Sequence, residues 1–220
     1  MYIIIMLYDG YTKKTYKTLQ RIKDINIKSI SISRAPLRSA IDDILNILSL
    51  SSWEKLKKSH GFDEFFHLYM IIHLENDEYI IVEKSINIYL YTIDKNSAYL
   101  QNEQKQVSQI PIITVGQLLQ TTKNTMGDRY LPYDAFNNNC QDFMIGILTA
   151  NNMINKDLET FIKQDVEELA KDLPNWTQKL GLAITNLIGY IDKLRQAVGL
   201  KKGGIVMTDN IKRKKRIGNI

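Results

Sequence analysis

Residues 65–84 have the sequence FFHLYMIIHLENDEYIIVEK. Two apolar runs, rich in β-branched and aromatic residues, flank the polar stretch 75–78, which is typical of a β-hairpin. A further apolar run at 86–91 predicts a third strand, so this part of the chain should form an antiparallel meander. Alternation along the first strand places His67 and His73 on the same face of the predicted sheet.

The regions around this meander predict further strands and helices. Residues 26–33 alternate apolar and polar side chains, the pattern of a half-buried strand. Thr114 and Gln117 have the spacing of a capping box at a helix start, and Pro36 suits a first helical turn because its missing N–H needs no partner there. The predicted strands are 2–8 and 26–33, and the predicted helices are 36–49, 114–125, 140–151, 156–171 and 176–198. This order of elements predicts an α+β fold.

The composition is that of a globular protein. The chain has 220 residues, of which 44% are hydrophobic and 24% charged, enough to bury a core in one domain. A single cysteine excludes an internal disulfide. The apolar run 1–8 is short and lacks a basic leader, so no signal peptide is expected. No run approaches the roughly 18 apolar residues of a membrane span, and we therefore expect a soluble, intracellular protein.

The single cysteine, Cys140, lies at the start of a predicted helix, between Asn139 and Gln141. Unpaired backbone N–H groups and the helix dipole favour the thiolate there, and the N–H of Cys140 is a candidate oxyanion-hole donor. His67 lies upstream on the first strand of the meander, and Glu83 lies on the returning strand. A nucleophile, a base and a group that orients the base are the components of a thiol hydrolase site.

Structural roles for the same residues stay open. A lone cysteine in an intracellular protein is commonly a small buried residue, and His67 or Glu83 alone would be ordinary strand residues. A metal site is not expected, because the three histidines and one cysteine have no compact ligand spacing. No cofactor is indicated.

The His67 strand, the strand that follows it, and residues 133–143 (YDAFNNNCQDF) occur in this order along the chain. This arrangement resembles the permuted papain-like cysteine hydrolases, the NlpC-type and lecithin:retinol acyltransferase-like families, in which the histidine strand precedes the cysteine helix. The acyltransferase-like proteins have Asn-Cys-Glu-His-Phe where this chain has NCQDF. The chain is also similar to a branch of these families found in large DNA viruses of eukaryotes, over roughly residues 30–210. The similar segments are collinear and lie at 33–37, 66–68, 82–84, 133–137, 161–165 and 207–209.

The resemblance implies a permuted papain-like fold in which the antiparallel sheet packs against the Cys140 helix. It also implies Cys140 as the nucleophile and His67 as the base. The acyltransferase-like relatives place a second histidine on the return strand, where this chain has Glu83, and a carboxylate can also orient an imidazole. The expected parts are a papain-like domain at 1–154, a helical extension at 155–200 and a basic tail at 201–220.

These features imply a cysteine-dependent hydrolase or acyltransferase acting through an acyl-enzyme on an amide, peptide or lipid-ester substrate. The alternative is a non-enzymatic virion protein, structural or interacting, on the same fold; the helices at 156–198 and the basic tail favour this reading because catalysis does not need them. The resemblance implies a viral origin, and with it a location in the virion or the infected-cell cytoplasm, where other virion proteins are candidate partners.

The C-terminal segment carries the positive charge of the chain. Residues 201–220 hold seven basic residues against one acidic, more than the whole net charge of +5. The densest basic run is Lys212, Arg213, Lys214, Lys215 and Arg216. The amphipathic helix 176–198, with Trp176 at its start, predicts packing on the body or on a partner, or contact with an anionic membrane surface together with the tail. The basic run could also contact nucleic acid, act as a localisation signal or be a solvated end. No aromatic residues alternate with these charges, so a stacking surface for single strands is not expected, and nucleic acid is the less favoured partner.

Overall fold

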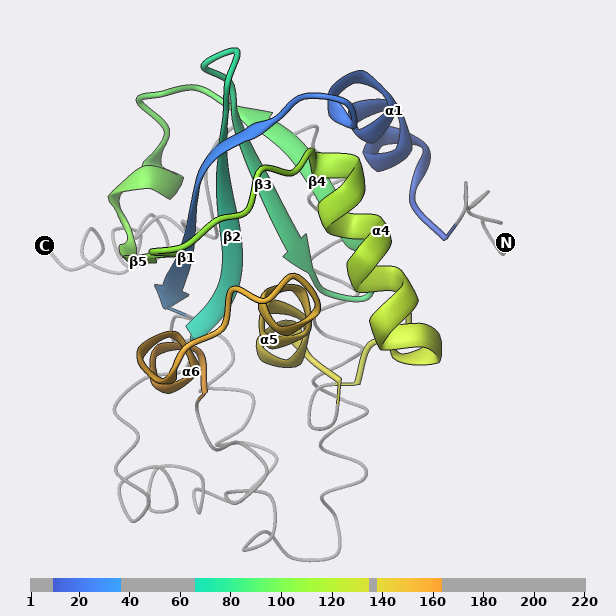
Figure 1. Ribbon diagram of the computed structural model, residues 1–220, viewed down its shortest axis with the longest axis vertical. Helices are drawn as coiled ribbons and strands as arrows, with labels where there is room; N and C mark the ends of the chain where they lie inside the picture. Colours follow the sequence, from blue (N-terminus) through green and yellow to red (C-terminus); the bar gives the residue numbers. More distant parts are fainter. Residues whose placement is uncertain (1–9, 37–65, 135–137, 164–220) are drawn as a thin grey trace, which may run out of the picture.

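Figure 1 shows the computed structural model, which describes residues 10–36, 66–134 and 138–163. These residues form four α-helices and one five-stranded antiparallel sheet, which confirms the predicted α+β class. The α-helices are α1 (Lys13–Ile22), α4 (Val115–Met126), α5 (Cys140–Ala150) and α6 (Lys156–Ile162). The strands are β1 (Ile27–Pro36), β2 (Phe66–Leu74), β3 (Tyr79–Lys84), β4 (Ile88–Ile93) and β5 (Glu103–Gln106). Two short 3-10 helices are η1 (Ala98–Gln101) and η2 (Gly127–Arg129).

The sheet has the strand order β4-β3-β2-β1-β5, and every neighbouring pair is antiparallel. Strands β2, β3 and β4 are the predicted meander. Asp77 closes the β2–β3 turn with a positive φ of 62°, a conformation that aspartate tolerates better than most residues. In the same turn the Leu74 N–H donates to the Glu78 carbonyl at 2.9 Å. The register then pairs Tyr69 of β2 with Glu83 of β3.

The alternation predicted along β2 divides its side chains between two cores. Leu68, Met70, Ile72 and Leu74 belong to the larger core, together with buried side chains of α4 and α5, and both helices lie over one face of the sheet in Figure 1. Tyr69 and Ile71 belong to a smaller core on the other face, with Ile81 and Tyr99. Because both faces are covered, β2 is nearly continuously buried and is held in a single register.

Helix α5 contributes more buried residues to the larger core than any other described helix. Phe143, Met144, Ile147 and Leu148 are fully buried. Helix α6 adds Leu158, Phe161 and Ile162 to the same core, although these residues follow the predicted domain boundary at residue 154. The capping box predicted at the start of α4 is also present, with Thr114 accepting from the Gln117 N–H at 3.3 Å.

Two predicted helix boundaries are wrong. Pro36 does not begin a helix: it ends β1 and pairs with Phe66, because the end of a strand tolerates a residue without an N–H. The helix predicted over 156–171 ends at Ile162, since Lys163 has extended backbone with ψ of 120°. The predicted segments 2–8, 37–49, 164–171 and 176–198 lie outside the described residues.

Helix α1 and strand β5 have no counterpart among the predicted elements. Helix α1 is mostly polar and buries only Thr15 and Ile22 fully, and β5, with the sequence EQKQ, is largely exposed. Helix α1 has only a short apolar stripe, Tyr16, Leu19 and Ile22, which packs on the larger core, and β5 has no apolar residue. Within the described ranges, no helix combines the length and the apolar character that crossing a membrane requires.

Candidate active site

The sheet brings His67 and Glu83 together. His67 is the second residue of β2, and Glu83 lies on β3 opposite Tyr69, so His67 and Glu83 are diagonal neighbours on one face. The His67 Nε2 and Glu83 Oε2 atoms are 3.0 Å apart. Both side chains are shielded, with 16% of the His67 side chain and 4% of the Glu83 side chain exposed.

Helix α5 brings Cys140 to the same histidine. Cys140 is the first residue of α5, and its thiol is a hydrogen-bonding neighbour of the His67 ring. Only 7% of Cys140 is exposed. The three residues that the sequence singled out, far apart along the chain, therefore form one continuous series from thiol to imidazole to carboxylate.

The surroundings of His67 favour its charged form. Burial, the largest influence, lowers the pKa of His67, but hydrogen bonding to Cys140 and Glu83 and attraction to their negative charges outweigh it and raise the pKa to about 10. The ring is therefore an imidazolium at neutral pH when it lies between the two anionic groups. A protonated ring beside a sulfur stabilises the thiolate, which is the nucleophilic form of cysteine.

The start of α5 is fixed by reciprocal capping. Asn139 Oδ1 accepts from the N–H of Gln141 at 2.8 Å and from the N–H of Asp142 at 3.3 Å. Asp142 Oδ2 accepts in return from the Asn139 N–H at 3.0 Å. The Phe143 N–H donates to the Asn139 carbonyl. Of these first amides, the N–H of Cys140 is the one for which the described residues supply no acceptor.

This capping defines what Asn139 and Gln141 do. Both flank Cys140, whose N–H the sequence indicates as an oxyanion-hole donor, and both are therefore candidate neighbours of that site. The side-chain oxygen of Asn139 is occupied by the cap, and the N–H of Gln141 is a donor to that cap. The amide that the helix start presents for a developing oxyanion is therefore that of Cys140 itself.

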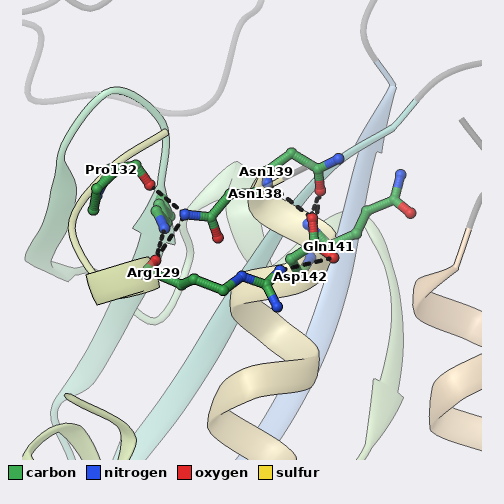
Figure 2. Close-up of polar contacts among 7 residues, drawn as sticks. Arg129, Pro132, Asn138, Asn139, Gln141 and Asp142 are labelled. Carbon is green, nitrogen blue, oxygen red and sulfur yellow. Dashed lines mark hydrogen bonds and ion pairs between the residues drawn. The ribbon is translucent and has the colours of Figure 1, made fainter. Parts of the chain in front are cut away.

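The segment before Cys140 is held by a second set of polar contacts, shown in Figure 2. Asn138 Nδ2 donates to the carbonyls of Arg129 at 2.8 Å and Pro132 at 2.7 Å. The Arg129 guanidinium lies 3.9 Å from Asp142 Oδ1, the other oxygen of the carboxylate that caps α5. The chain on both sides of residues 135–137 is thus tied to the start of α5.

The sequence interpretation missed three polar residues around the thiol: Lys84, Asn138 and Asp142. Asp142 had a recognisable signal, because Asn139 and Asp142 have the spacing of a capping box. Asn138 had none, since it acts through the backbone carbonyls of Arg129, the last residue of η2, and of Pro132. Lys84 ends β3 and was expected only as a strand residue, yet it is fully buried.

Trp176 and the basic run Lys212–Arg216 are outside the described residues, so their predicted membrane contact stays a prediction. Within the described ranges no group of three or more His, Cys, Asp and Glu side chains is arranged to hold a metal ion.

Comparisons of the chain with protein-family models, with curated proteins and with solved structures found no match.

The cap at Asn139 makes a testable contribution to stability. Replacing Asn139 with Ala removes the acceptor of two amides, so we expect the free energy of unfolding, measured by urea denaturation, to fall by about 1–2 kcal/mol. Asn139→Asp keeps an acceptor at the helix start and should retain most of the stability. An Ala variant as stable as the native protein would contradict the capping role.

Proposed function

We propose that this protein is a cysteine-dependent hydrolase or acyltransferase with Cys140 as its nucleophile. The observation that supports this most directly is the series Cys140, His67 and Glu83, in which an imidazole has a thiol neighbour and a carboxylate at 3.0 Å. A nucleophile, a base and an orienting group in contact are the minimum for covalent acyl transfer.

The proposed reaction has two halves. The thiolate of Cys140 attacks the substrate carbonyl carbon, and a C–S bond forms as the carbonyl π electrons move to oxygen. Collapse of this intermediate breaks the bond to the leaving group, which takes its proton from the His67 imidazolium. A water molecule or an acceptor alcohol or amine then loses its proton to His67 and attacks the thioester, which releases the acyl group and frees Cys140.

Glu83 has a definite part in this scheme. Its carboxylate pairs with Nε2 of His67. Nδ1 is therefore the ring nitrogen that exchanges a proton with the sulfur. An imidazole oriented by a carboxylate keeps one tautomer and one ring position through both halves of the reaction. The N–H of Cys140, which has no acceptor among the described residues and lies at the positive end of α5, is the donor for the oxyanion.

The fold and setting form part of the same proposal. A cysteine at a helix start against an antiparallel sheet that carries the histidine is the arrangement expected of a permuted papain-like enzyme. On the resemblance in sequence, the protein would be viral and would act in the virion or the infected-cell cytoplasm. Peptide, other amide and lipid-ester substrates all offer the carbonyl that the site requires.

A second candidate function is non-enzymatic. Cys140 and Glu83 are both buried, and a buried series of polar contacts also serves to fix a fold uniquely. In this reading the protein is a virion structural or interaction component, and Cys140 never forms a covalent intermediate.

An activated ester distinguishes the two functions. Incubation with p-nitrophenyl acetate should release more than one equivalent of p-nitrophenol per chain and should leave a transient acetyl group on the Cys140 peptide, detected by mass spectrometry after acid quench. Cys140→Ser should show neither. Release at the same rate by native protein and Cys140→Ser would overturn the enzymatic proposal and favour the structural one.

A further inference from the structure

Lys84 is buried directly beside the proposed site. It is the last residue of β3 and follows Glu83, so strand alternation sends the two side chains to opposite faces of the sheet. Glu83 contacts His67, while Lys84 reaches the side on which α5 packs. Lys84 is fully buried, a rare location for an ammonium group.

The ammonium of Lys84 holds the segment that leads to Cys140. Lys84 Nζ donates to the Arg129 carbonyl at 3.0 Å, and Asn138 Nδ2 donates to the same oxygen at 2.8 Å; Figure 2 shows the Asn138 bond. Lys84 Nζ also lies 5.5 Å from the ring centroid of Phe143, one turn into α5. The lysine therefore joins the end of β3 to both sides of the nucleophile.

Three charged or ionisable groups act on Lys84: Asp142, Arg129 and Cys140. Burial is the largest influence on Lys84 and lowers its pKa to about 8. Attraction to Asp142 and Cys140 raises this pKa, and repulsion from Arg129 lowers it. Among the described residues, Lys84 forms no ion pair with a carboxylate. A buried cation without a direct counter-ion has a high cost, which an anion formed nearby would reduce.

We propose that Lys84 is a positioning residue that acts through Cys140. It anchors the Arg129 carbonyl, which holds the approach to α5, and its positive charge favours the thiolate of Cys140. This inference rests on the proposed function, because it assigns the thiolate to the working form of the protein. Lys84 is then a second positive group that acts on Cys140, beside the imidazolium of His67, and it lies on the opposite face of the sheet from His67.

The test is the pH dependence of Cys140 alkylation by iodoacetamide, measured on the full chain. Lys84→Met keeps the length and apolar body of the side chain. For this variant we expect the midpoint of the alkylation-rate profile to shift to higher pH by about half a unit, so that the rate near pH 6 is about threefold lower. Lys84→Arg should stay close to native. Lys28→Met is the matched control, because Lys28 is exposed and pairs with Asp77.

A merely structural lysine would leave the pH profile of the folded Lys84→Met protein at its native position, and that result would overturn the inference. The native profile itself tests the proposed function: if native Cys140 alkylates like a free thiol, the proposed function fails whatever Lys84 does. If the native profile lies at lower pH than that of a free thiol and the profile of Lys84→Met is the same as the native one, only the role of Lys84 fails.

A second measurement does not depend on the folding of Lys84 variants. Charge coupling is reciprocal, so removing the thiolate should make the Lys84 ammonium easier to deprotonate. In NMR titrations with lysine labelled at Cε, the midpoint of the Lys84 signal should be lower in Cys140→Ser than in the native protein. Equal midpoints would contradict the coupling.

Discussion

Replacing His67 with Ala should lower the rate of Cys140 alkylation by iodoacetamide near pH 6 by about tenfold or more. In the native protein the imidazolium keeps its proton up to a pKa of about 10, and in the proposed mechanism its charge stabilises the thiolate. An ordinary thiol ionises near pH 8.5, so without the imidazolium only about one per cent or less of the sulfur is thiolate near pH 6. The measurement is the pseudo-first-order alkylation rate, followed by mass spectrometry, from acid to alkaline pH.

His73→Ala is the matched control for this experiment. His73 lies on the same strand and the same face as His67. Its ring stacks on that of Tyr79, with 4.3 Å between the ring centroids, and its Nε2 contacts Asp77 in the exposed hairpin turn. Its removal should leave the alkylation profile of Cys140 unchanged. Equal rates for native protein and His67→Ala, both folded, would remove the imidazole from the proposed mechanism.

The sheet was largely predictable from the sequence. Strands β2, β3 and β4 carry long apolar runs with a turn between them, and their order along the chain is also their order in the sheet. Strand β5 was not predictable, because its pairing with β1 depends on backbone hydrogen bonds and not on an apolar side-chain period. Helix α1 is a comparable case, since its polar sequence depends on tertiary contact with β4.

The candidate site was predictable in part, for a different reason. Cys140, His67 and Glu83 belong to residue types with distinctive chemistry, and the hairpin alone places His67 near Glu83. The contact between Cys140 and His67 depends on how α5 packs on the sheet, which no local pattern specifies. Lys84 was missed because a lysine at a strand end is ordinarily exposed, whereas here its ammonium lies between the Arg129 carbonyl of η2 and the Phe143 ring of α5.

The second large effect is expected for Glu83→Gln, which keeps the shape of the side chain and removes its charge. Glu83 raises the pKa of His67 through both a hydrogen bond and charge attraction, so the pKa of His67 should fall in the variant. A glutamine amide can also donate to Nε2, and the ring proton would then be on Nδ1. A protonated Nδ1 cannot accept a proton from the sulfur of Cys140. By analogy with the amide replacement in serine protease triads, turnover of p-nitrophenyl acetate should fall by about 100-fold or more.

The pH dependence of stability gives an independent readout of the same substitution. Because the pKa of His67 is higher in the folded protein than the ordinary value of 6.5, the native protein has its full contribution from this group below pH 6.5 and loses it as the pH rises toward about 10. In Glu83→Gln that loss should be smaller and complete at lower pH, as measured by urea denaturation across the range together with ring-nitrogen NMR shifts of His67. Glu78→Gln is the control, since Glu78 lies in the same hairpin but pairs with Arg21 at 2.7 Å. An unchanged His67 titration in Glu83→Gln would mean that the 3.0 Å contact does not govern the protonation of the ring, and Glu83 would then lose its place as the orienting group.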